Sequence, residues 1–271
     1  MSNLNLQHYK NNQFILKSNI LLLFLLSFSF LHTSFAQTNL GQFINKDLPC
    51  LDKKLTIHVH WVNDSLHVDS TKTPNLLTAI YQLNKAFEPI CLSFEVCKID
   101  FINYYEFDTL TLPTEFEELD KRNHEDFRLN LYIVSLLDTA ACGFTTFYSM
   151  DLYEGAAIVV TKDCLEKNVI PHFVGISLGL LETADTQYGL ELVNGSNCQT
   201  AGDKICDTPA DPQYEAKSCD IINSKIDPNG EIYLPDISNF MSGYFGCQCK
   251  FSYQQYKLLA ANYNALKKKP W

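Results

Sequence analysis

The sequence has 271 residues, 46% of them hydrophobic, and a formal net charge of −10 at neutral pH. An acidic chain whose longest basic run is Lys267–Lys269 is poorly matched to a phosphate backbone, so we expect no nucleic-acid partner. The length allows one sizeable domain or two subdomains.

Residues 1–36 have the pattern of a secretory signal peptide. Lys10 and Lys17 precede an apolar run from Ile20 to Leu31, and Ser34–Ala36 forms a small-x-small cleavage site. The apolar run has about twelve residues, whereas a membrane-spanning helix needs roughly 20. We therefore predict cleavage after Ala36, a secreted chain (extracellular or periplasmic), and no stable membrane anchor.

All ten cysteines follow the predicted cleavage site. An exported chain meets oxidising conditions, so we predict disulfides rather than a cysteine metal site. Cys247 and Cys249 form the one C-x-C pair and have no second pair at zinc-finger spacing. Cys91 cannot bond to Cys97, because a strand would separate their Cα atoms by about 20 Å and a disulfide tolerates less than about 7 Å.

Residues 37–53 are a polar lead-in, and residues 54–182 contain most of the predicted strands and helices. Leu55–Val62 alternates at period two, which predicts a strand with one apolar face. The other face carries His58 and His60, which could chelate a metal. No third ligand is evident beside them, so we interpret them as polar groups on a partly exposed face.

The elements that follow continue this alternation of strands and helices. Tyr105–Asp126 is acidic, and we interpret it as a surface excursion with a short helix over Glu115–Arg122. The order of the elements predicts an α/β (α+β) fold in which a twisted mixed sheet packs on a buried helix. The other predicted elements are helices over Asn75–Phe87 and Tyr253–Leu266, strands over Ile90–Ile102, Arg128–Leu136 and Ala156–Thr161, and an edge strand after Ala141.

The buried helix is predicted within Ile170–Asp185. Only Ser177 is polar between Phe173 and Leu181, so the helix should lie in the core. We predict that Asn168 caps its start, while Pro171 falls in the first turn, where no amide hydrogen is needed.

The same segment has the spacing of the zinc-protease helix H-E-x-x-H-x-x-G-x-x-H. His172 keeps the first histidine, and the turn glycine is also present. Phe173 replaces the general base, whose loss alone typically costs about 10²–10⁴-fold in rate. Ile176 replaces the second histidine on the same helix face. Glu182 replaces the third, where a carboxylate is an acceptable zinc ligand. We therefore predict no catalytic residue, and interpret His172 and Glu182 as vestigial zinc positions.

Two downstream runs complete the pattern, Gly202–Pro209 (G-D-K-I-C-D-T-P) and Asn239–Ser242 (N-F-M-S). With the helix, they resemble the pappalysin family of metzincin zinc proteases, in the secreted bacterial style, over essentially the whole mature chain. The resemblance implies a metzincin-like fold with a cleft and a loop-rich C-terminal subdomain over residues 183–271. It also implies that Met241 is a structural residue in a methionine turn beneath the metal.

The family's activity is zinc-dependent cleavage of proteins, with zinc held by three histidines. Because this chain lacks two of them, we expect zinc to be absent or weakly bound. Some family members also bind calcium in the loop that corresponds here to Asp203, Asp207 and Thr208, which makes calcium a candidate cofactor.

The sequence supports three hypotheses. The first is a catalytically inactive pappalysin-like homologue, a pseudoprotease, that binds a protein or peptide in the former cleft. The second is an active zinc metalloendopeptidase that takes a metal ligand from outside the helix. The third is a structural or surface-binding secreted protein. The second hypothesis requires a ligand from among His58, His60, His67, His124 and Asp185.

Overall fold

The computed structural model describes residues 47–63, 73–107, 109–139, 141–146, 157–212, 219 and 225–266. The predicted signal peptide, most of the lead-in, and His67 lie outside these residues. The contacts divide the chain after Asp47, and all elements below belong to the unit Leu48–Trp271. No helix in the described part of the chain is both long enough and apolar enough to cross a membrane.

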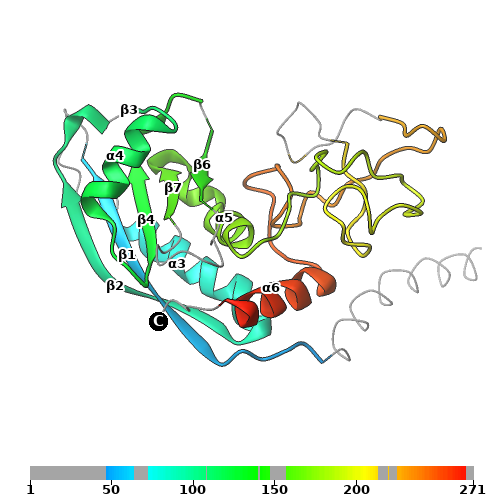
Figure 1. Ribbon diagram of the computed structural model, residues 1–271, viewed down its shortest axis with the longest axis horizontal. Coiled ribbons are helices and arrows are strands. Elements are labelled where there is room, and N and C mark those ends of the chain that lie inside the picture. The colour runs from blue at the N-terminus through cyan, green and yellow to red at the C-terminus, as the bar shows by residue number, and fades with distance from the viewer. Residues whose placement is uncertain are drawn as a thin grey trace, which may run out of the picture. The chain divides into compact units, whose positions relative to one another are not determined.

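A five-stranded mixed sheet forms the centre of the fold (Figure 1), as the sequence predicts. Four strands run parallel, and the edge strand predicted after Ala141 pairs antiparallel to its neighbour. A helix connects the first two strands, because neighbouring parallel strands need a long crossover. In spatial order the strands are β2 (Leu92–Ile102), β1 (Lys53–Val62), β4 (Leu129–Val134), β7 (Ala157–Thr161) and β6 (Gly143–Thr145).

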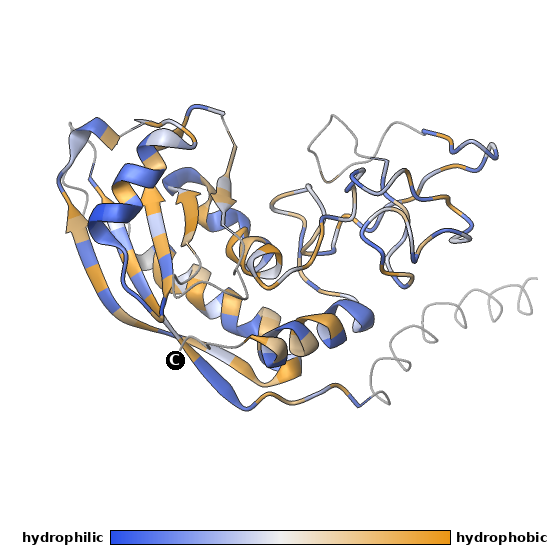
Figure 2. Cartoon of the chain, in the orientation of Figure 1, coloured by the Kyte–Doolittle hydropathy of each residue, from blue (hydrophilic) through white to orange (hydrophobic). Residues whose placement is uncertain are grey.

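The sheet has one hydrophobic core on each face. Ile57, Val59 and Trp61 of β1 point to the face that packs against three helices, as the period-two pattern predicts. Tyr132 and Val159 point to the opposite face, where a fourth helix packs. Figure 2 shows apolar residues concentrated on the central strands. The helices are α3 (Thr73–Phe87), α5 (Ile170–Ser177) and α6 (Tyr253–Ala265) on the first face, and α4 (Thr114–Asn123) on the second.

The helix α4 confirms the short helix predicted over Glu115–Arg122 and corrects the interpretation of residues 105–126 as a surface excursion. Phe116 and Leu119 are buried and pack against the sheet. Two apolar residues one turn apart are enough to anchor a helix that is otherwise acidic. The same face carries the short elements η3 (Tyr105–Phe107), β3 (Thr109–Leu110) and β5 (Leu136–Leu137).

The helix α5 starts and ends differently from the prediction. Asn168 does not cap it: with φ of 57° it ends the 3-10 helix η4 (Lys162–Lys167), and Val169 takes the N-cap position without a side-chain hydrogen bond. Pro171 lies in the first turn, as predicted. The helix stops at Ser177, because Gly179 adopts φ of +87° and turns the chain out of the helix.

Four disulfides confirm the predicted use of most cysteines and fit an oxidising compartment. Cys97 and Cys249 are not disulfide-bonded, so the predicted use holds for eight of the ten cysteines. Cys91 is not bonded to Cys97, as strand geometry requires. The pairs are Cys50–Cys91, Cys142–Cys164, Cys198–Cys206 and Cys219–Cys247.

The described chain between α5 and α6 is rich in loops, as predicted, with two isolated β-bridges (Figure 1). Phe240, Met241 and Phe251 belong to the same core as α3 and α5. The Tyr256 hydroxyl of α6 also donates to the Ala86 carbonyl of α3 over 2.8 Å. The boundary between residues 182 and 183 stays a prediction, since residues on both sides of it share one core.

Candidate functional site

His172 is fully buried on α5, and both of its ring nitrogens face a partner. Nδ1 lies 2.8 Å from the carbonyl oxygen of Phe240. Because a carbonyl only accepts, Nδ1 must carry the proton of this bond. Metal-ligating histidines are often oriented by the same type of bond, which here leaves Nε2 of His172 as the ring nitrogen that faces Glu182.

The structure brings together the two predicted vestigial zinc positions. Nε2 of His172 lies 3.1 Å from Oε1 of Glu182, within ion-pair distance but outside hydrogen-bond geometry. In a neutral ring with Nδ1 protonated, Nε2 presents a lone pair, which a carboxylate repels. The contact is therefore favourable only when a proton or a metal cation lies between the two atoms.

Hydrocarbon side chains occupy the positions of the base and the second histidine. Phe173 is buried and contacts the His172 ring edge-on at a centroid distance of 5.0 Å. Its ring presses on β6 so closely that a Cβ added to Gly143 would lie 2.4 Å from it. Ile176 is half-buried at the edge of the core. Neither residue offers a lone pair, so His172 and Glu182 are the donors that remain from the motif.

Met241 lies directly against α5. It is fully buried, and a Cβ added to Gly175 would come within 2.6 Å of its Sδ. Its carbonyl accepts a 3.0 Å hydrogen bond from the Thr183 amide, just beyond the helix. This packing accords with a structural role for Met241, while the methionine turn as a family feature stays a prediction.

A pocket of about 280 Å³ opens beside these residues. Its walls come from the edge strand β6 and from α5 with the turn that follows it. Most of the lining is apolar, and the two carboxylates are its charged groups. The lining residues are Phe144, Thr145, Phe173, Ile176, Leu180, Leu181, Glu182 and Asp185.

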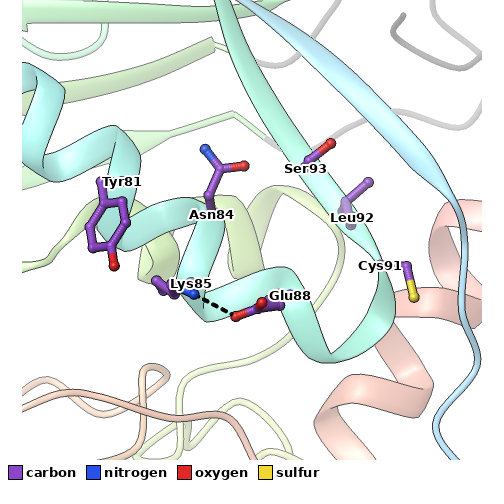
Figure 3. Close-up of a pocket in the computed structure, with 7 residues that line it drawn as sticks. All are labelled: Tyr81, Asn84, Lys85, Glu88, Cys91, Leu92 and Ser93. Atoms are coloured by element: carbon purple, nitrogen blue, oxygen red, sulfur yellow. Dashed lines mark hydrogen bonds and ion pairs between the residues drawn. The ribbon is translucent and has the colours of Figure 1, made fainter.

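A second pocket, of about 320 Å³, lies between α3 and β2 (Figure 3). Its charged groups, Lys85 and Glu88, neutralise each other in an ion pair of 3.0 Å. Tyr81 and the bonded Cys91 also line it. The lining contains no histidine and no pair of carboxylates, so this larger pocket offers less chemistry than the pocket beside His172.

The structure places two of the three calcium candidates in contact. Thr208 Oγ1 donates to the Asp203 carboxylate over about 3.0 Å, and the Ile205 amide donates to the same carboxylate. The Asp207 carboxylate instead accepts hydrogen bonds from Ser252 and Gln254 at the start of α6.

Glu191 is a candidate residue that no pattern in the sequence indicates. Its Oε2 is buried and has no hydrogen-bond partner. Burial and, to a lesser degree, the charge of Asp203 raise the pKa of Glu191 to about 7. Burial also raises the pKa of Asp203 to about 7, against the opposing effect of hydrogen bonds from Ile205 and Thr208. Two coupled buried carboxylates are an oxygen-rich site that only the fold assembles.

A further group lies on the sheet itself. Within the described part of the chain, His58, His60 and Asp100 are the one group of three or more His, Cys, Asp or Glu residues whose ligand atoms lie within 4.8 Å of one another. His58 and His60 are buried, which corrects the expectation of a partly exposed face, and Asp100 is the third residue that the sequence did not show. Burial lowers the pKa of His60 to about 4, despite the hydrogen bond that its Nε2 donates to Asn130.

The comparisons with known proteins show a distant likeness in fold. No family model and no curated protein matches the chain. The chain is similar to metalloproteinase-II from Bacteroides fragilis over 52% of its own length and 47% of that chain, with 11% identity and a TM-score of 0.34. It is also similar to a chain from a chaperone–substrate complex, over 77% of its own length and 38% of that chain, with 11% identity and a TM-score of 0.39. The chain therefore spans less than half the length of these two structures.

The sheet and helices thus define a mixed α/β protein. Within this fold, a buried histidine and a carboxylate meet beside a mostly apolar pocket.

The buried carboxylates predict a pH-dependent stability. Between their ordinary pKa values near 4 and their folded values of about 7, the folded state binds more protons than the unfolded state. The free energy of unfolding should therefore fall as pH rises through this range. Glu191→Gln removes one of the two charges, so in a metal chelator it should raise the Tm at pH 8 but not at pH 4, as measured by circular dichroism.

The matched control for this experiment is Glu88→Gln, which alters an exposed glutamate and should leave the pH profile close to that of the wild type. His60 is present in the wild type and in both variants, so a difference in Tm between these three proteins reports the substituted glutamate and not His60. A lower Tm for Glu191→Gln than for the wild type at pH 8 would contradict the prediction.

Proposed function

We propose that the protein is a secreted pappalysin-like metalloprotease homologue without peptidase activity, which binds a protein or peptide segment in the cleft beside α5. One observation carries the proposal: Phe173 and Ile176 fill the base and second-ligand positions with hydrocarbon, while Nε2 of His172 faces Glu182. The predicted signal peptide and the four disulfides support export.

A catalytic zinc ion takes three protein ligands and a water molecule. His58 and His60 lie on the sheet face opposite to α5 and are out of reach of His172. His124 is bonded to Asp120 and to Asn130 on that opposite side.

Asp185 lines the same pocket as Glu182, but the two carboxylates and His172 do not form a three-ligand group. The contact between His172 and Glu182 is the observation that favours the second hypothesis, an active zinc enzyme with a non-standard site.

The proposed binding cleft combines a sheet edge with a pocket. β6 pairs only with β7 among the described strands, so its other edge can pair with an extended peptide. An apolar side chain of such a peptide would enter the pocket lined by Phe144 and Ile176. Main-chain hydrogen bonds would then supply affinity, and the pocket would supply selectivity for an apolar residue.

We also propose a calcium site at the loop of Asp203. Carboxylate and hydroxyl oxygens are the ligands that calcium prefers, and the buried, unpartnered Oε2 of Glu191 adds a donor beside Asp203 and Thr208. Asp207 would contribute only after releasing its bonds to the start of α6. A bound cation would neutralise both carboxylates and remove the cost of their burial.

Restoring one ligand tests the loss of the zinc site. Ile176→His gives α5 and the turn after it a His-His-Glu set, a ligand combination that holds catalytic zinc in other enzymes. We expect the variant to bind one zinc ion more per chain than the wild type, as measured by elemental analysis after dialysis.

The double variant Ile176→His, His172→Ala should lose this additional zinc. The wild type should not cleave a peptide library, with or without added zinc. Chelator-sensitive cleavage by the wild type that His172→Ala abolishes would overturn the proposal in favour of an active enzyme.

Introducing a charge into the pocket tests whether it binds a peptide. Ile176→Glu places a carboxylate among the apolar lining, and should weaken binding of apolar peptides selected from a library by at least about tenfold, or about 1.4 kcal/mol. Fluorescence polarisation with labelled peptides would measure this.

Leu77→Glu on α3, at a position 63% exposed, is the matched control and should bind like the wild type. Equal affinity of the two variants would place peptide binding elsewhere and favour a surface-binding protein.

Calcium should stabilise the wild-type chain at pH 8. An ion at 100 times its Kd raises the free energy of unfolding by about 2.7 kcal/mol when it binds only the folded state. Asp203→Asn retains an acceptor for Thr208 but should lose the rise in Tm on addition of calcium, as followed by calorimetry. Magnesium at equal concentration is the control ion, and an equal rise for both ions, or for the variant, would contradict the proposal.

A further inference from the structure

The polar side chains on β1 and β2 gather on one face of the sheet because of the strand register. In this parallel pair His58 lies opposite Lys98, and His60 lies opposite Asp100. Residues two apart on a strand share a face, so all four point to the same side. The His60 ring stacks on Tyr132 of β4 at a centroid distance of 4.4 Å, which identifies this side as the α4 face.

Neighbouring hydrogen bonds fix the orientation of the His60 ring. Asn130 Oδ1 accepts from the Glu125 amide, and its Nδ2 donates to the Glu125 carbonyl, so the amide group has one orientation. Oδ1 lies 3.0 Å from His60 Nε2, which must therefore donate. Nδ1 of the neutral His60 ring then carries a lone pair.

His58 has the same arrangement. Its Nε2 lies 2.8 Å from Oδ2 of Asp100, which accepts when ionised. The Nδ1 atoms of both histidines are buried without a hydrogen-bond partner. The two rings are only 4.0 Å apart between centroids, and the residues are 2% and 1% exposed. Buried polar atoms normally find partners, and two adjacent unpartnered lone pairs are the groups that a bound cation would satisfy.

We propose that His58, His60 and Asp100 form a binding site for a divalent transition-metal ion of the zinc class, separate from the site on α5. Two imidazoles and a carboxylate are ligands that zinc accepts. Their ligand atoms lie within 4.8 Å of one another, and a tetrahedral zinc ion needs a separation of about 3.4 Å. A contraction of up to about 1.4 Å would close the site.

The surroundings suit such an ion. Asn130 orients His60, and Asn130 is itself held by His124, which is bonded to Asp120. Partners of this kind position metal ligands and fix their tautomers. The ion would join β1 to β2, the strand at the edge of the sheet.

Lys98 is the competitor for this site. Its ammonium lies 2.7 Å from Oδ2 of Asp100 and supplies the positive charge that the carboxylate now faces. The Lys98 side chain is 57% exposed and can swing into solvent. A metal ion would therefore displace it, and removal of the lysine charge should strengthen metal binding.

The experiment is a titration of the untagged, chelator-treated chain with Zn²⁺ and with Co²⁺. Calorimetry measures the binding of each ion, and the visible spectrum reports the coordination of bound Co²⁺. The wild type should bind one ion. Asp100→Asn should bind it at least about tenfold more weakly, and Lys98→Met should bind it more tightly. His60→Phe, which keeps the stacking on Tyr132, should abolish the Co²⁺ spectrum.

His172→Ala is the matched control and should leave binding and spectrum unchanged, so the result does not depend on the function proposed for α5. Asp100 is 40% exposed at its side chain, so its variant should fold even if His60→Phe does not. The proposal is overturned if the wild type binds no ion, if His172→Ala removes the ion, or if Asp100→Asn binds it as tightly as the wild type.

Discussion

The contact between α5 and the segment around Met241 is the constraint on which the structure of the cleft depends. His172 donates from Nδ1 to the Phe240 carbonyl, and Gly175 leaves just enough room for the Met241 sulfur. These contacts place the helix over the sheet with a defined rotation. That rotation points Nε2 of His172 at Glu182 and turns Ile176 toward the pocket.

Different atoms hold α5 in place and face the pocket. The Nδ1 bond of His172 and the packing of Gly175 against Met241 hold the helix. Nε2 of His172 faces Glu182, and Ile176 lines the pocket. Phe173 adds apolar packing against Gly143 and the ring of His172.

Titratable groups are buried in two places, in the loops after α5 and on the α4 face of the sheet. Glu191 and Asp203 resist ionisation, because burial raises the pKa of each carboxyl and the charge of Asp203 adds to the effect at Glu191. On the α4 face, burial lowers the pKa of His60 and keeps its ring neutral. Both clusters therefore suit a cation. At the carboxylates, a metal ion would supply the positive charge that burial otherwise leaves uncompensated. At the histidines, it would supply a partner for the buried lone pairs.

Periodicity and chain geometry act over a few residues, so local patterns in the sequence were enough to predict several features. These features are the strands, the edge strand after Ala141, the core position of α5 and the exclusion of a Cys91–Cys97 bond. The local pattern misplaced the cap at Asn168, because Asn168 ends the preceding 3-10 helix and Val169 starts α5 without a side-chain hydrogen bond. Only the tertiary structure decided that Asp100 lies beside His60, and Glu191 beside Asp203. Strand register and loop closure bring these pairs together from distant parts of the chain, so no spacing within a short stretch of sequence predicts the contacts.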